Sequence, residues 1–251
     1  MDTSNRPLKT PRHESVILIF LEKEYSPGKI QTALNHLEEL NGISSIKKSI
    51  RNVGEAKFYF SSKLNKDFIQ NILPNKIDKA AHWISKYSDI KITKMLGEHL
   101  HYLVKAELRA HGFKIVSEKN VRSYGNKIWN RTKHSLDMVA IHQQKNLEIG
   151  VEVKNMLTLP PKSEIVTKIE MCEHLGIIPV FASRWMEPYR SYIQEKNGFL
   201  WQFKTQIYPL GQENFVTEIQ KRFQLPAEVI PELPSHAIMK FSTWLENPQK
   251  S

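Results

Sequence analysis

Cysteine is nearly absent from this chain, which has Cys172 alone among 251 residues. A single thiol excludes an intrachain disulfide and a cysteine-based zinc site, and this usage is typical of a reducing compartment. No segment approaches the ~18 apolar residues of a membrane-spanning helix, and residues 1–15 lack the apolar stretch of a secretory signal. We therefore expect a soluble, intracellular, cytoplasmic protein in which Cys172 is a buried helical thiol.

Several common functional motifs are also missing. The sequence contains no phosphate-binding P-loop, no dinucleotide-binding glycine pattern and no internal repeat. His99 and His101 are closely spaced, but neither belongs to an HExxH motif. The sequence therefore gives no support to a zinc enzyme or to those nucleotide-binding folds.

Acidic residues are outnumbered, because 36 lysines and arginines face 26 aspartates and glutamates and give a net charge of +10. A basic surface gains affinity for nucleic acid by releasing counterions from the phosphates. Anionic membranes also attract basic proteins, but that interaction needs a basic amphipathic helix or a lipid anchor, and neither is evident. The charge therefore predicts a nucleic-acid partner and no membrane.

The stretch from Ser135 to Lys154 contains two strand-like runs joined by the polar link 143–146. If the turn is centred on this link, Asp137 lies directly opposite Glu152 and both side chains point to one face. Facing carboxylates repel each other, so they need a cation, a proton or solvent, and a divalent metal is the simplest solution. Lys154 lies on the same face, about 6 to 7 Å further along the strand.

The opposite face of this hairpin is expected to be apolar and to pack on a helix. Its residues alternate with those of the charged face: Leu136, Met138 and Ala140 on one strand, and Ile149, Val151 and Val153 on the other.

Asp137, fourteen intervening residues and then Glu152-x-Lys154 resemble the active-site signature of the PD-(D/E)xK nuclease superfamily. Leu136 replaces the proline that usually precedes the aspartate. The resemblance covers about residues 97–209, where the expected elements follow the order of the superfamily's αβββαβ core. It implies an α/β, restriction-endonuclease-like fold, with a mixed central sheet flanked by helices.

The resemblance implies Mg²⁺-dependent hydrolysis of phosphodiester bonds by a DNA endonuclease of the restriction, repair or junction-resolving type. Asp137, Glu152 and the main-chain carbonyl of Val153 would bind Mg²⁺, with Mn²⁺ as a substitute. Lys154 would orient or help deprotonate the attacking water. Lower-ranked active-site candidates lie on the flanking helices: Glu98 by location, Glu107 by helical periodicity, and Lys168.

Two alternatives to an active DNA endonuclease stay open at this stage. A short D…ExK pattern also occurs on exposed hairpins, where acids and lysines form a solvated face. The chain would then be an inactive nucleic-acid-binding module on the same fold. An RNA-processing nuclease on this scaffold is the second alternative. A homodimer is one option, since two sites cut both strands of a duplex most simply, and a monomer that nicks the two strands in sequence is the other.

The segment 118–134 is rich in basic residues interleaved with aromatics. Cations grip phosphates and exposed aromatic rings stack on bases, so the segment is a candidate nucleic-acid contact, and a further arginine follows the strand 177–182. The alternative is a solvated loop whose tryptophan belongs to the core. The candidates are Lys119, Arg122, Lys127, Trp129, Arg131, Lys133 and Arg184.

Hydrophobic patterning and chain breakers predict four parts. They are a flexible arm (1–13), an N-terminal α+β domain with a connector (14–89), the nuclease-like core (90–210), and a C-terminal helical extension and tail (211–251). In the first domain we expect a strand at 16–22, a helix at 27–40, strands at 43–51 and 56–61, and a helix at 66–73. In the core and extension we expect helices at 92–111, 163–175, 187–196 and 215–223, and strands at 113–116, 177–182 and 199–208.

Overall fold

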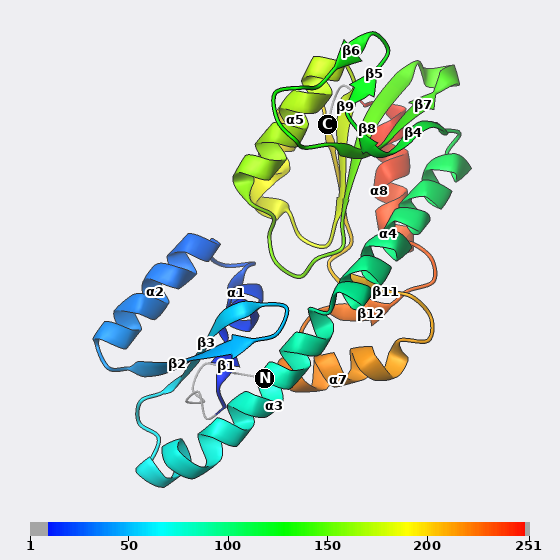
Figure 1. Cartoon of the computed structure of the whole chain (residues 1–251). Coiled ribbons are helices and arrows are strands. Elements are labelled where there is room, and N and C mark those ends of the chain that lie inside the picture. Colours follow the sequence, from blue (N-terminus) through cyan, green and yellow to red (C-terminus); the bar gives the residue numbers. More distant parts are fainter. Residues whose placement is uncertain (1–9, 249–251) are drawn as a thin grey trace. The chain divides into compact units, whose positions relative to one another are not determined.

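The computed structural model describes residues 10–248 and divides the chain into two compact units (Figure 1). The N-terminal unit is Met1–Lys94 with Glu218–Leu225, and the sheet unit is Met95–Thr217 with Pro226–Ser251. Most of the arm expected at 1–13 lies outside the described residues.

The N-terminal unit is built on a small antiparallel sheet in the order β1-β3-β2. Its helix α2 begins as the sequence predicts, because the Ser26 side chain accepts from the Lys29 N–H and Pro27 occupies the first turn. The elements are β1 (Arg12–His13), α1 (Glu14–Leu21), α2 (Pro27–Glu39), β2 (Ile43–Ile50), β3 (Gly54–Ser61), the π-helix η1 (Phe68–Ile72) and α3 (Leu73–Tyr87).

The strand expected at 16–22 is wrong, because this segment is helix α1. Its apolar run is continuous, and such a run has no periodicity that separates a buried strand from a helix. The His13 side chain accepts the Ser15 N–H and caps the helix, while Val16, Ile17 and Ile19 are buried. The connector expected after residue 73 is the long helix α3.

The sheet unit has a mixed central sheet flanked by helices, as predicted. In its order β10-β9-β8-β7-β4, strands β4, β7 and β8 are antiparallel neighbours, and β8, β9 and β10 are parallel. The elements in chain order are α4 (Ile90–Ala110), β4 (Lys114–Val121), β5 (Ser123–Tyr124), β6 (Lys127–Ile128), β7 (Leu136–His142), η2 (Gln143–Lys145), β8 (Leu147–Lys154), α5 (Lys162–Leu175), β9 (Ile178–Ser183), η3 (Glu187–Tyr189), α6 (Arg190–Glu195), β10 (Phe199–Gln202), β11 (Gln206–Tyr208), α7 (Glu213–Phe223), β12 (Ala227–Val229) and α8 (Ser235–Glu246).

Helices cover both faces of this sheet (Figure 1), and each face has its own hydrophobic core. On one face, Leu100 and Val104 of α4 pack with Met138 and Val151 of the hairpin. On the other face, α5 packs on β7 and β9. The charged end of the hairpin therefore lies under α5.

The part expected as a C-terminal helical extension and tail (211–251) contains a second helix, α8, that was not predicted. Its Phe241 is fully buried and stacks on Trp201 of β10, with ring centroids 4.3 Å apart. Pro234 is the N-cap of this helix and does not interrupt it. The single strand expected at 199–208 is also wrong, because the chain forms β10 at the sheet edge and then β11, which pairs with β12.

Two smaller corrections concern the segments beside the hairpin. Strand β4 continues to Val121 and a short pair, β5 and β6, follows, so the expected loop 118–134 is partly β structure. Helix α5 begins at Lys162, one residue before the predicted start at 163, with Pro161 as its N-cap.

No helix among residues 10–248 has both the length and the apolar character needed to cross a membrane.

Candidate active site

The hairpin of β7 and β8 has the predicted register. Met138 pairs with Val151 and His142 pairs with Leu147, which centres the turn between Gln144 and Lys145. Continuing the register by one pair places Asp137 opposite Glu152. The turn itself is the short η2 helix, closed by Asn146 in the left-handed conformation.

The two carboxylates lie close together but have different partners. An oxygen of Asp137, Oδ2, accepts the main-chain N–H of Val153 at 2.7 Å, which fixes the aspartate beside β8. Glu152 is only 3% exposed and lies between two lysines. Its Oε2 is 2.7 Å from Lys168 Nζ, and its Oε1 is 2.9 Å from Lys154 Nζ.

The charges around Glu152 oppose one another. Burial is the largest effect and raises the pKa of its carboxyl, and the negative charge of Asp137 raises it further, while Lys168 and Lys154 lower it. Burial also lowers the pKa of Lys154, but Glu152 and Glu164 outweigh it and the net pKa is raised. Lys154 is therefore a firmly charged ammonium at the end of β8.

Glu164 is a member of this cluster that sequence reasoning missed. Its Oε1 is 2.7 Å from Lys154 Nζ, so Lys154 bridges two carboxylates. Glu164 precedes Lys168 by four residues on α5, a spacing that places both side chains on one helix face. The signal in the sequence that could have identified Glu164 is its i, i+4 spacing from the candidate Lys168.

Lys168, a lower-ranked candidate on α5, contacts the hairpin through Glu152. It is 5% exposed and also donates to the main-chain carbonyl of Ser135, just before β7. The lysine therefore joins α5 to both strands of the hairpin.

The donor set suits Mg²⁺, which prefers carboxylate and carbonyl oxygens, and the mutual repulsion of Asp137 and Glu152 is what a cation would relieve. Residues 10–248 hold no group of three His, Cys, Asp or Glu side chains arranged for a metal ion. Glu98 and Glu107 of α4 therefore do not add a third carboxylate to Asp137 and Glu152. Glu107 pairs with His111 at 3.1 Å, and Glu98 is exposed. The Val153 carbonyl and water would complete such a site.

The apolar face of the hairpin is as predicted except at Leu136. Val121 pairs with Leu136 beyond a register shift in β4, where Lys119 and Asn120 both have positive φ. Leu136 packs on the α5 side with Cys172, in the core that the charged face adjoins. Cys172 is the predicted buried helical thiol, and burial raises its pKa.

The nucleic-acid candidates fall into two groups. Trp129 is 1% exposed and donates to the Thr132 hydroxyl, so its ring belongs to the core, and Arg184 is 2% exposed and donates to the Leu157 carbonyl. Neither side chain offers a free surface for a base or a phosphate. The exposed members are Lys119, Arg122, Lys127, Arg131 and Lys133.

The segment carrying these five cations lies against α5, since His174 bonds to the Ile128 carbonyl at 3.0 Å. Arg122 holds the segment together by donating to the Thr132 carbonyl. The exposed cations thus come from the segment that leads directly into β7 and Asp137.

No family model, no curated protein and no solved structure matched the chain.

Proposed function

We propose that the chain is a Mg²⁺-dependent DNA endonuclease that hydrolyses phosphodiester bonds at the Asp137–Glu152 hairpin. The observation that carries the proposal is the opposed pair of carboxylates, with Lys154 two residues beyond Glu152 on the same face. The chain order α4, β4, β7, β8, α5, β9 around them supports it, because the resemblance to PD-(D/E)xK nucleases implies that order.

Each residue has a role that its surroundings support. Asp137, Glu152 and the carbonyl of Val153 would hold Mg²⁺, which neutralises the charge that builds up on a phosphate during attack by water. Lys154 is charged and 25% exposed, so it can hold the scissile phosphate or orient the attacking water. Its contact with Glu164 fixes the direction of the ammonium.

The exposed basic residues before β7 would bind the phosphates on either side of the cut. Sequence-independent grip on a duplex comes from such contacts, and each neutralised phosphate adds to the salt dependence of binding. Lys127 and Lys133 are representative members, both exposed and close in sequence to Asp137.

One observation favours a second candidate, an inactive nucleic-acid-binding module on the same fold. Both oxygens of Glu152 have lysine partners, so the fold neutralises this carboxylate with its own side chains. An active enzyme must exchange at least one of these contacts for a metal ion. An inactive module keeps both.

The test is cleavage of supercoiled plasmid, linear duplex, branched DNA, single strand and RNA with Mg²⁺, Mn²⁺ or EDTA. Wild type is compared with Asp137→Asn and Lys154→Ala, and with Lys162→Ala as an exposed control on α5. Metal-dependent cutting that is lost in the first two variants and kept in the control supports the nuclease.

Binding without cutting at any metal concentration supports the inactive module instead. Cutting confined to RNA, with a requirement for the 2′-hydroxyl, replaces the DNA substrate with RNA. Sedimentation of the protein with and without a duplex distinguishes a homodimer from a monomer.

A further inference from the structure

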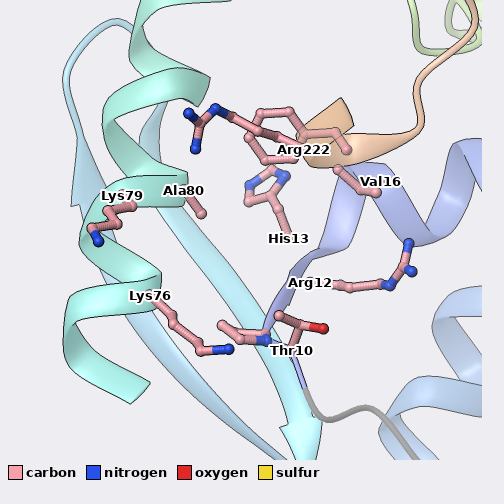
Figure 2. Close-up of a pocket in the computed structure, with 10 residues that line it drawn as sticks. Thr10, Arg12, His13, Val16, Lys76, Lys79, Ala80 and Arg222 are labelled. Carbon is pink, nitrogen blue, oxygen red and sulfur yellow. The ribbon is translucent and has the colours of Figure 1, made fainter. Parts of the chain in front are cut away.

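The N-terminal unit contains a cavity of about 230 Å³ between β1, α1, α3 and the end of α7 (Figure 2). Its lining combines apolar and cationic side chains, and none of the lining residues is acidic. They are Thr10, Pro11, Arg12, His13, Val16, Lys76, Lys79, Ala80, Arg222 and Phe223.

His13 supplies a directed hydrogen-bond donor to this cavity. Its Nδ1 accepts the Ser15 main-chain N–H, which leaves Nε2 as the protonated nitrogen of the neutral ring. Among residues 10–248 the structure gives this Nε2 no hydrogen-bond partner. In Figure 2 the ring projects into the centre of the lining, toward Ala80 and Arg222.

Four of the side chains that line the cavity are cationic. Lys76 runs toward Thr10 at the lower edge, while the charged ends of Arg12 and Lys79 point away from His13 (Figure 2). Arg222 is bonded to Glu218 at 2.7 Å and lies over the Trp83 ring, so its charge is shared. The long, partly exposed lysine side chains can turn toward an anion at the opening at little cost.

The walls are apolar and include an aromatic ring. Phe223 and Val16 face the cavity with Ala80, and Phe223 is held edge-on by Tyr87 at 5.9 Å between centroids. The volume lies below the ~300–1,000 Å³ of pockets for drug-sized ligands, so it suits one planar ring system. A ligand with a flat ring inside the cavity and an anionic group at its opening matches this distribution of apolar and cationic side chains.

We propose that this cavity binds one nucleoside phosphate, with the base against His13 and Phe223 and the phosphate at Lys76. The ligand is a free nucleotide or a single unstacked nucleotide of a strand. The lining of the cavity indicates a ligand with an apolar ring, an anionic group and a hydrogen-bond acceptor. The choice of a nucleotide among such compounds rests on the proposed function of the sheet unit.

Calorimetric titration of the full chain in EDTA tests the proposal, because EDTA separates binding from any metal-dependent cleavage. The probes are AMP, adenosine, inorganic phosphate and a 5′-phosphorylated single-stranded oligonucleotide. The variants are Ala80→Leu, which fills the cavity without changing charge, and Lys76→Gln. Lys29→Gln on α2 is the control, since Lys29 is exposed and outside the cavity lining.

We expect AMP to bind at least tenfold more tightly than adenosine or phosphate alone. Ala80→Leu should weaken AMP binding tenfold or more and Lys76→Gln about threefold to tenfold, with no change in Lys29→Gln. Tight binding of the oligonucleotide identifies a strand as the source, and binding of AMP alone identifies a free nucleotide.

Equal affinity for phosphate and AMP, absence of binding, or full affinity in Ala80→Leu would overturn the proposal. Photo-crosslinking of 8-azido-AMP to the wild type is a second test that does not depend on variant folding, and labelled peptides outside residues 10–21, α3 and residues 218–225 contradict it. Asp137→Asn should bind AMP normally, so a failed nuclease proposal is distinguishable from a failed nucleotide site.

Discussion

Lys168 and Glu152 form an ion pair inside the sheet unit, with Nζ and Oε2 2.7 Å apart and side chains 7% and 3% exposed. Solvent is nearly absent here, so the negative charge of Glu152 is neutralised mainly by the ammonium group of Lys168. The negative charge of Asp137 opposes the ionisation of Glu152. Its second contact, to the Ser135 carbonyl, ties the same amine to the start of β7. The stability of the fold therefore depends on the positive charge of Lys168, and a metal ion bound by Glu152 would partly replace that charge.

Removing that amine should destabilise the protein. Lys168→Gln leaves Glu152 with Lys154 as its remaining lysine, and we expect the free energy of unfolding to fall by about 3 kcal/mol. Lys196→Gln is the control, because its pair with Glu173 is exposed and worth about 0–1 kcal/mol. Urea unfolding followed by tryptophan fluorescence measures both. Equal effects in the two variants would show that the Lys168 pair has no special weight.

Mg²⁺ should restore part of this loss if Asp137 and Glu152 bind it. A ligand that binds only the folded state stabilises it in proportion to the logarithm of its concentration. We expect the unfolding midpoint of Lys168→Gln to rise with Mg²⁺ more steeply than that of wild type, where Lys168 competes. A rise of the same size in Lys168→Gln and in Lys168→Gln/Asp137→Asn would argue against metal binding at this site.

The contact between Glu164 and Lys154 should affect the rate of cleavage, and this prediction rests on the nuclease proposal. Lys154→Ala removes the charge near the phosphate and should lower kcat about 100-fold or more. Glu164→Gln keeps the lysine but releases its ammonium, so a smaller loss, about tenfold, is expected. Single-turnover cleavage measures both, and a Glu164→Gln enzyme with wild-type kcat would remove Glu164 from the site.

Two glycines of the sheet unit should respond oppositely to alanine. A Cβ at Gly150 would meet Cys172 Sγ, Ile177 Cδ1 and Leu136 Cδ1 at 2.8 Å, so overpacking should cost about 1–3 kcal/mol. Gly97 lies within α4 with no atom within 4 Å of an added Cβ, and alanine there should stabilise the helix by up to about 1 kcal/mol. Thermal unfolding of both variants checks the opposite signs.

His13 should make stability depend on pH. Burial lowers its pKa from 6.5 to about 4, and the nearby Arg12, Lys76, Lys79 and Arg222 add no negative charge. Between these values the unfolded chain binds a proton that the folded chain does not. The stabilising contribution is therefore complete above pH 6.5 and disappears as pH falls toward 4, by up to about 3 kcal/mol.

The matched variant for this effect is His13→Asn, which keeps a residue suited to capping α1 but does not titrate. Denaturant unfolding at several pH values between 4 and 7.5 gives the difference between the two proteins. Wild type should lose more stability than His13→Asn over this interval. Parallel curves would show that His13 is not buried in its neutral form.

The hairpin was predictable because strand side chains alternate with a period of two. The polar link fixes the position of the turn and therefore the register of the two strands. A shift of the register by one residue would move the apolar residues that share a face with Met138 and Val151 to the charged face. The burial of Glu152 by Lys168 was only partly predictable, since it depends on how α5 packs on the sheet. Trp129 shows the same limit, because a tryptophan among basic residues fits a core position and an exposed one equally well.

Two of the differences from the predicted elements have separate causes. The segment Val16–Leu21 is apolar at every position, so its helical form is decided by the cap at His13 and by packing. The segment after residue 226 contains Pro231, Pro234 and Pro248, and a proline in a helix interior interrupts the helix. Pro234 instead precedes a helix, where a missing N–H costs nothing.

That helix, α8, should be essential to the sheet unit. Phe241 is fully buried against Trp201, Phe199 and Trp244, so Phe241→Ala removes a ring from the centre of the aromatic cluster and should cost about 3–5 kcal/mol. Met239→Ala is the control on the same helix, since Met239 is 64% exposed, and its effect should stay within about 0.5 kcal/mol. Urea unfolding measures both. A loss below 1 kcal/mol in Phe241→Ala would mean that α8 is dispensable for the core.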